Sequence, residues 1–162
     1  MKKDKIRLSI ISFILIITDQ IIKYFIRLQA NFMPIDMIKN IIKINYVENF
    51  GIAFGIAEGG RFIFIFINFI VMGIILKFLF KQWTNLDKIK KFFIMLIISG
   101  GIGNLIDRIF RGYVIDYIDC TQIINFPVFN LADIMIVIGA IVVAISIIRD
   151  MLNENKKSKN SI

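Results

Sequence analysis

The stretch FFIMLIISGGIGNLIDRIF, residues 92–110, decides the fold class of this chain. As a helix it is long enough to cross about 30 Å of hydrocarbon. Its middle holds small residues at positions 99, 100, 101 and 103, which allow two membrane helices to approach closely. Asn104, Asp107 and Arg108 follow at spacings of three and four and therefore share one helix face. The stretch predicts a tightly packed membrane helix that carries a polar face.

Three more apolar segments resemble this one in length, at about residues 8–28, 61–80 and 129–148. The chain is 57% hydrophobic, and its mean hydropathy is +0.76. Its 162 residues suggest one domain. We therefore predict an α-helical integral membrane protein with four transmembrane helices in a single domain over 1–162. The polar end, residues 153–162, is predicted to be a disordered tail.

Cationic residues account for the formal net charge of +8 and predict the topology. They gather before the first segment, between the second and third, and after the fourth. By the positive-inside rule both termini are cytoplasmic, N-in and C-in, and the loops at about 29–60 and 111–128 face outward. Trp83 fits an interfacial anchor on the cytoplasmic side. In the first outer loop, Ile42, Ile44 and Tyr46 alternate with polar residues, which predicts a strand. Residues 47–55 mix apolar and small side chains and suit the membrane interface.

Composition excludes several kinds of chemistry. With no histidine, the chain has neither a Ser-His-Asp nor a Cys-His set. One cysteine, Cys120, cannot form an intramolecular disulfide. One thiol and scattered carboxylates make a poor zinc site, whereas a carboxylate-bound divalent ion remains compatible with the composition. No basic stripe interleaves with exposed aromatics, so a nucleic-acid surface is disfavoured.

Ionisable residues inside the apolar segments have two interpretations. Each charge near a helix centre costs about 2.5–3.5 kcal/mol, so such groups are functional candidates. Asp19 and Lys23, four residues apart, can also form a self-contained ion pair that only anchors the helix. Arg108 can pair with Asp107 or reach other carboxylates. These residues favour a polar clamp between helices over direct chemistry, because an arginine that holds a carboxylate lowers its pKa.

Acids near the fourth segment are individually ambiguous. Asn130 and Asp133 share a face at its start, where Pro127 marks the preceding turn. Taken alone, Asp133 is a helix-start acid, Asp116 a solvated loop carboxylate and Asp119 a surface acid. The residues by themselves predict a polar cluster near the outer face. A membrane hydrolase, a small transporter or proton conductor, and a binding or assembly protein all remain open. Against transport, the polar groups do not continue through the second segment.

Motifs along the chain resemble those of lipoprotein signal peptidase (signal peptidase II), a bacterial intramembrane aspartyl protease family. Any one of these motifs is weak evidence for the family, whereas all of them in the family's order over most of the chain are specific evidence. Ile52 departs from the alanine of the family's second motif. The matching stretches are DQIIK at 19–23, NFGIAF at 49–54, GNLIDR at 103–108, VIDY at 114–117 and FNLAD at 129–133.

The resemblance implies a function and a site. It implies removal of signal peptides from prolipoproteins before a diacylglyceryl-modified cysteine, at the extracytoplasmic face of the bacterial cytoplasmic membrane. We expect a monomer, and the reaction needs no metal or cofactor. It implies a small β-sheet cradle, which suits Ile42–Tyr46, and a short lid-like helix. Asp116 and Asp133 would be the catalytic pair. The residues that would support or line the site are Asp19, Lys23, Asn49, Gly51, Asn104, Asp107, Arg108 and Asn130.

A carboxylate pair suits this reaction on physical grounds. Two nearby carboxylates cannot easily both ionise, so they share a proton and titrate together. The ionised member can take a proton from water, which attacks the scissile carbonyl, while the protonated member polarises that carbonyl and later protonates the leaving amine.

Overall fold

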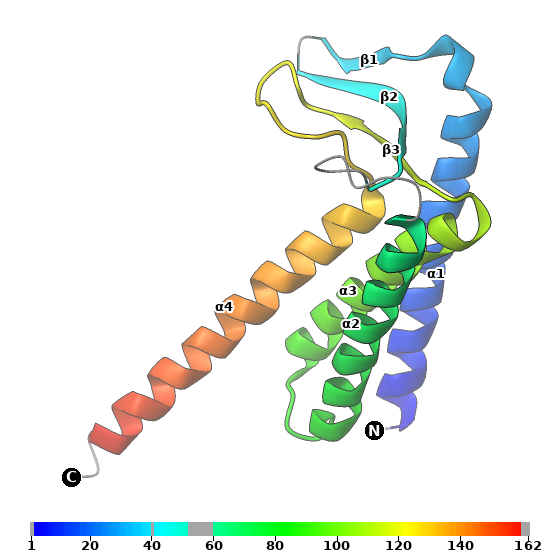
Figure 1. The fold of residues 1–162 in the computed structure, drawn as a ribbon. Helices are drawn as coiled ribbons and strands as arrows, with labels where there is room; N and C mark the ends of the chain where they lie inside the picture. Colours follow the sequence, from blue (N-terminus) through cyan, green and yellow to red (C-terminus); the bar gives the residue numbers. More distant parts are fainter. Residues whose placement is uncertain (1, 40, 52–59, 160–162) are drawn as a thin grey trace.

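The computed structural model describes residues 2–39, 41–51 and 60–159. Four long helices dominate the chain, and each is long and apolar enough to cross a membrane. This confirms the predicted four-helix membrane architecture (Figure 1). The helices are α1 (Lys2–Leu28), α2 (Gly60–Gln82), α3 (Lys88–Phe110) and α4 (Leu131–Lys159).

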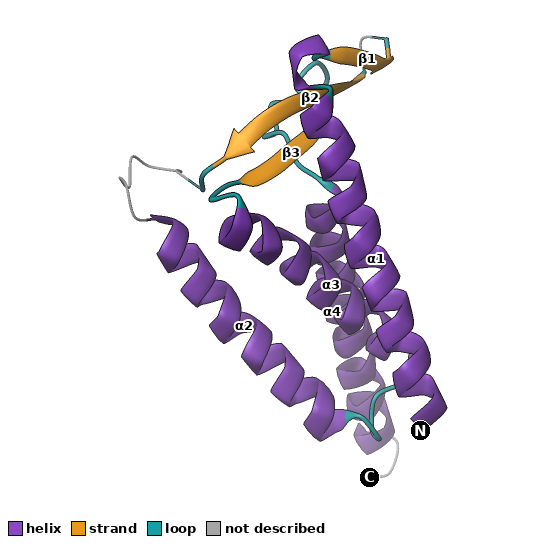
Figure 2. Cartoon of the chain, turned by 90° about the vertical axis from the view of Figure 1, so that its right-hand side faces the viewer, coloured by secondary structure: helices purple, strands orange, loops and turns teal. Residues whose placement is uncertain are grey.

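A small sheet sits at one end of the helices, and both chain termini lie at the other end (Figure 2). Its three strands run antiparallel in the order β1 (Ile35–Ile38), β2 (Ile42–Asn49), β3 (Val114–Asp119). The predicted strand at 42–46 is confirmed as the first part of β2. Pairing of β2 with β3 aligns Val47 with Asp116. The end of β2, at Asn49, lies opposite the start of β3, at Val114.

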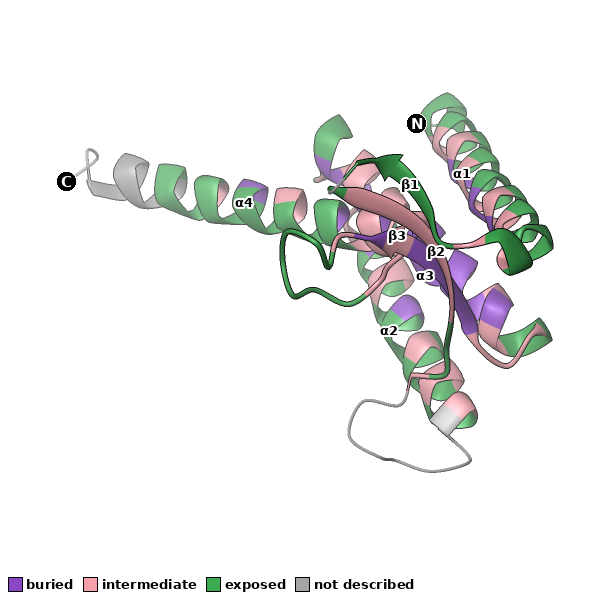
Figure 3. Ribbon diagram, turned by 90° about the horizontal axis from the view of Figure 1, so that it is seen from above, coloured by how far each residue is buried: buried purple, intermediate pink, exposed green. Residues whose placement is uncertain are grey.

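Helix α3 is the centre of the bundle. It packs against α1, α2 and α4, and 56% of its most apolar stretch is buried, against 11% to 22% for the other three helices. Figure 3 shows this contrast between buried α3 and β3 and the exposed outer faces. Phe13, Phe62 and Phe66 are examples of large apolar side chains on those outer faces. Such faces are stable only against lipid tails.

Small residues let α3 approach its neighbours, as the sequence predicts. A Cβ added to Gly100 would lie 2.3 Å from the Ala132 carbonyl oxygen of α4. A Cβ added to Gly103 would lie 2.7 Å from Oδ2 of Asp19 on α1. Real Cβ atoms do not approach so closely, so these two glycines set the spacing of three helices.

The helices extend past the predicted apolar segments into charged sequence. α1 begins at Lys2, α3 at Lys88 and α4 runs to Lys159, because lysine and glutamate are good helix formers and propagation of an existing helix is cheap. The predicted disorder of residues 153–162 is therefore wrong for 153–159, while 160–162 lie outside the described residues. α4 begins at Leu131, two residues later than predicted.

The outer segments are described only in part. Residues 47–49, predicted to lie at the membrane interface, form the end of β2. Ile52 and the rest of the NFGIAF motif through Phe54 lie outside the described residues, as does all of 52–59. Of the described residues before β1, Ala30–Phe32 form a short 3-10 turn, η1. The lid-like helix stays a prediction.

Candidate active site

Asp116 is buried on β3, with 2% of its surface exposed. Its Oδ2 accepts a hydrogen bond of 2.8 Å from Asn49 Nδ2, at the end of β2. Its Oδ1 accepts one of 2.6 Å from Asn130 Nδ2. The interpretation of Asp116 as a solvated loop carboxylate is therefore wrong, because strand pairing encloses it.

Asp133 lies in the first turn of α4, where a reciprocal cap fixes it. Its backbone N–H donates to Asn130 Oδ1 at 3.0 Å, and its Oδ2 accepts from the Asn130 backbone N–H at 3.1 Å. This is the arrangement of a capping box, which satisfies two backbone donors at a helix start. Its other oxygen, Oδ1, accepts from Asn104 Nδ2 at 2.7 Å. The helix-start interpretation of Asp133 is confirmed, but it describes only half of the contacts.

Burial sets the acidity of Asp116. The pKa of this carboxyl is raised from 3.8 to about 6, with burial as the largest cause, and the negative charge of Asp133 acts in the same direction. Hydrogen bonds from Asn49 and Asn130 and the charge of Lys23 oppose the shift. Asp133 is thus close enough to affect the titration of Asp116, which is the coupling expected of a carboxylate pair.

Lys23 forms the centre of a fully buried charge cluster below the two aspartates. Its Nζ lies 2.9 Å from Asp19 Oδ2 and 2.9 Å from Asp107 Oδ2, and all three side chains are fully buried. Two carboxylates around one ammonium repay burial only when further hydrogen bonds complete them. Asp19 and Lys23 are therefore not the self-contained pair that their spacing alone allows.

Further donors complete this cluster, and they are residues for which the sequence reasoning assigned no role. Arg111 Nη1 forms an ion pair with Asp107 Oδ1 and donates to Gln20 Oε1 at 2.9 Å. Gln20 Nε2 in turn donates to Asp107 Oδ1 at 3.2 Å. Asp107 and Arg111 are four residues apart, a spacing that signals such a pair on a helix.

The charge cluster is connected directly to the aspartate pair. Lys23 Nζ donates to Asn104 Oδ1 at 3.0 Å, and the amide group of Asn104 donates to Asp133. Asp19 Oδ1 accepts from the Ala132 backbone N–H at 3.1 Å, at the start of α4. The cluster therefore orients both the asparagine beside Asp133 and the helix that carries Asp133.

Arg108 does not pair with Asp107, one of the two possibilities that the sequence leaves open for this arginine. Asp107 is occupied by Lys23 and Arg111. The Arg108 guanidinium instead lies over the Phe64 ring, 5.4 Å from its centroid, and donates to the Asn104 carbonyl at 3.4 Å. Adjacent residues on a helix point in different directions, so Asp107 and Arg108 serve different neighbours.

Gly51 shapes the entrance beside Asp116. Its φ of 73° is a left-handed conformation, and its added Cβ would lie 2.4 Å from the Phe64 ring. Its N–H donates to Asn49 Oδ1 at 2.7 Å, which orients the amide that faces Asp116. Next to it opens a pocket of about 340 Å³. The pocket is lined by Val47, Glu48, Asn49, Phe50, Asp116, Pro127 and Val128.

Asp119 is not the surface acid that the sequence suggests. It is 8% exposed and accepts hydrogen bonds from Thr121 Oγ1 at 2.6 Å and from Thr121 N at 2.9 Å. Asn45 Nδ2 donates at 3.3 Å. These bonds, with those of Thr121 the largest cause, lower the pKa of Asp119. It ends the strand and lies apart from the hydrogen bonds of the aspartate pair.

Comparison with known proteins agrees with the motifs. The family model described as signal peptidase (SPase) II matches residues 11–149. The chain belongs to the signal peptidase II family. It is therefore a peptidase, and the four apolar helices make it a multi-pass membrane protein.

Individual relatives support the same assignment. A lipoprotein signal peptidase of Halothermothrix orenii is 41% identical over 132 residues, 81% of this chain and 88% of that one. Another, from Streptococcus agalactiae, is 36% identical over 157 residues, 93% of this chain and 97% of that one. A solved bacterial membrane enzyme matches with a TM-score of 0.78 and 30% identity, covering 91% of this chain and 90% of that one.

Proposed function

We propose that this signal peptidase II family member removes signal peptides from prolipoproteins, cutting on the N-terminal side of a diacylglyceryl-modified cysteine. Asp116 and Asp133 are the catalytic residues of the proposal. The observation that carries it is the joint hold of Asn130 on both carboxylates. A buried Asp116 that lines an open pocket, with the half-buried Asp133 held by the same asparagine, has the form needed for acid–base catalysis.

In the proposed reaction the pair holds one proton. The ionised carboxylate takes a proton from a water molecule, and the resulting hydroxide attacks the scissile carbonyl carbon. The protonated carboxyl donates a hydrogen bond to the carbonyl oxygen and later supplies the proton that the leaving amine needs. The raised pKa of Asp116 supports this, because it keeps a proton on the pair closer to neutral pH.

Three asparagines keep the pair oriented throughout the cycle. Asn49, Asn104 and Asn130 each donate to one of the two carboxylates. An amide donor orients a carboxylate without adding a charge. Its hydrogen bond therefore offsets only part of the rise in the carboxyl pKa, and the pair still holds one proton. Arg108 supplies positive charge that interacts with both aspartates. It is suited to stabilising negative charge on the substrate carbonyl as the bond breaks.

Two pockets suit a substrate that is part peptide and part lipid. The pocket beside Asp116 has a polar edge and lies at the sheet. A second pocket of about 230 Å³ lies between α2, α3 and α4 and is mainly apolar, with Arg108 at its edge. Apolar substrate groups held there would fix the scissile bond against the aspartates, and such binding energy can be used for orientation. The apolar lining is Phe64, Ile67, Val71, Met72, Ile75, Ile97 and Ile136.

The proposed topology follows from charge. Lysines and arginines gather at the helix ends opposite the sheet, so the positive-inside rule places those ends in the cytoplasm. The sheet and the aspartate pair then lie at the extracytoplasmic face of a bacterial cytoplasmic membrane. A monomer suffices for this proposal, because one chain supplies both carboxylates and all their donors.

The substrate is tested with one precursor peptide in two forms. We expect rapid cleavage of the form with a diacylglyceryl group on the cysteine and poor cleavage of the unlipidated form, measured by mass spectrometry of the products. Equal turnover of both forms would contradict the lipid requirement. Proton or solute flux through liposomes without cleavage would favour the transport alternative.

A further inference from the structure

At the end of the molecule opposite the aspartate pair, a pocket of about 320 Å³ opens between the first turns of α1 and α3. Arg7, Lys88 and Lys91 bring three cations to it. Asp4 also lines it, so positive charge is in excess. Such a pocket has no part in the proposed peptidase chemistry.

We propose that this pocket binds the headgroup phosphate of an anionic phospholipid. Basic pockets between membrane helices recognise such headgroups by charge. Arg7 is suited to this, because its guanidinium presents several donors in a fixed fork that matches phosphate. Lys88 and Lys91 add two ammonium groups from α3.

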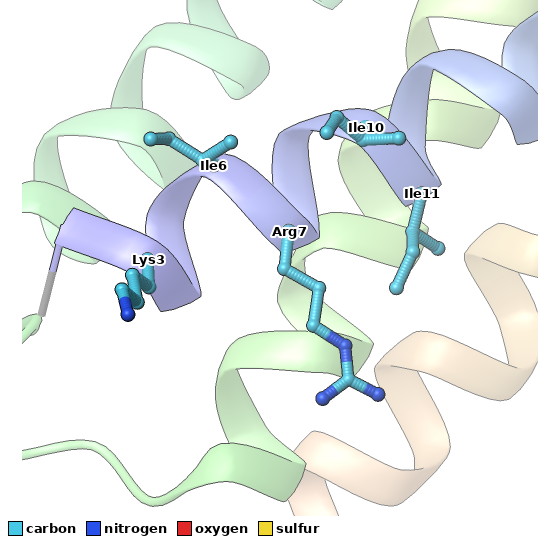
Figure 4. Close-up of a pocket in the computed structure, with 5 residues that line it drawn as sticks. All are labelled: Lys3, Ile6, Arg7, Ile10 and Ile11. Atoms are coloured by element: carbon cyan, nitrogen blue, oxygen red, sulfur yellow. The ribbon is translucent and has the colours of Figure 1, made fainter.

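The direction of the Arg7 side chain supports the proposal. Figure 4 shows Lys3, Arg7 and Ile11 leaving α1 on the side opposite Ile6 and Ile10, with the Arg7 guanidinium at the end of an extended chain. Arg7 lines both this pocket and a neighbouring one over the outer face of α1. Within the part of the chain that the structure describes, Arg7 and Lys88 form no salt bridge, so their charge is available to an anion.

The apolar part of the lining favours a lipid over a free phosphate ion. Leu8, Ile11 and Phe92 line the same pocket as the three cations. A lipid phosphate at the cations would place its proximal acyl chain along these side chains. An inorganic phosphate would make no contact with this apolar part of the lining.

Trp83 also lies at this end of the bundle and provides a built-in reporter. It is the chain's single tryptophan, it is 6% exposed, and Lys91 Nζ lies 5.2 Å from its ring centroid. Because Lys91 also lines the pocket, a lipid bound there would bring its acyl chain near the indole ring. Quenching of Trp83 fluorescence by brominated acyl chains therefore measures occupation of the pocket.

The experiment uses the full chain in phosphatidylcholine bilayers that contain a small fraction of brominated lipid. We expect brominated phosphatidylglycerol to quench Trp83 more strongly than brominated phosphatidylcholine at the same fraction. In Arg7→Gln/Lys88→Gln this preference should fall by roughly fivefold for each cation removed. The control variant Lys77→Gln/Lys81→Gln loses the same charge from exposed positions of α2. Its preference for phosphatidylglycerol should remain that of the wild type.

A charge-conserving variant, Arg7→Lys/Lys88→Arg, keeps the test sound if the glutamine variant misfolds, because it should retain most of the preference. Three results would overturn the proposal. These are equal quenching by the two brominated lipids in the wild type, an equal loss of preference in the pocket and control variants, and reversal of quenching by inorganic phosphate. The last result would assign the pocket to a free anion.

Discussion

Asn130 Nδ2 lies 2.6 Å from Oδ1 of Asp116, so the residue that caps α4 also holds the carboxylate on β3. The same residue exchanges two hydrogen bonds with Asp133. One side chain thereby couples the start of a membrane helix to the edge of the sheet. Substitutions of Asn130 can therefore separate its role as a helix cap from its role in orienting the aspartate pair.

Replacing Asn130 by serine should leave stability nearly unchanged but lower activity. Serine is a good N-cap, but its shorter side chain does not reach Asp116. Asn130→Ala should lower activity too and, in addition, destabilise the protein by about 1 kcal/mol through loss of the cap. Thermal unfolding in detergent and kcat/KM for the lipidated precursor measure the two effects. If the serine variant kept wild-type kcat/KM, Asn130 would be only a helix cap.

The pH dependence should report the raised pKa of Asp116. Below about pH 6 this carboxyl holds its proton, so kcat/KM should fall as pH rises through about 6 and the shared proton is lost. Asn49→Ala removes a donor that favours the ionised form, and should move this fall to higher pH. Asn45→Ala, which removes a donor to Asp119 from the same strand, is the matched control. If kcat/KM of Asn49→Ala fell over the same pH range as that of the wild type, the assignment of this pKa to Asp116 would be contradicted.

The raised pKa of Asp116 also makes the stability of the protein depend on pH. Folded Asp116 binds its proton more tightly than the unfolded chain does, with a pKa of about 6 against 3.8. Its contribution to the free energy of unfolding is therefore full below pH 3.8 and is lost as pH rises through about 6. The aspartate pair is thus held at some cost to stability, as is common at functional sites.

Much of this arrangement was accessible from the sequence, and the missing parts have a common cause. The four helices, the strand at 42–46 and the close packing at Gly100 follow from local periodicity and residue size. The enclosure of Asp119 does not, because it depends on strand pairing. For Asp107, the sequence leaves open whether its neighbour Arg108 is the partner. Side-chain direction on the helix instead selects Arg111, at a spacing that the sequence does contain.

Gly103→Ala should destabilise the protein, whereas Gly73→Ala should not. The added methyl at Gly103 would lie 2.7 Å from Asp19 Oδ2 in the buried charge cluster, while nothing lies within 4 Å of one at Gly73. We expect a loss of about 1–3 kcal/mol at Gly103 from overpacking and a gain of roughly 0.5–1 kcal/mol at Gly73 from helix propensity. Chemical unfolding in micelles compares them. Equal effects would show that α1 and α3 have room to separate.

The central claim is that Asp116 and Asp133 together activate water. The most direct measurement is cleavage of the lipidated precursor by Asp116→Asn and Asp133→Asn, with Asp119→Asn as the control from the same strand and with far-UV circular dichroism to verify folding. The proposal predicts a loss of at least roughly 10²–10⁴-fold in kcat for each of the first two and near-normal turnover for the control. Full activity in either folded variant of the pair would contradict it.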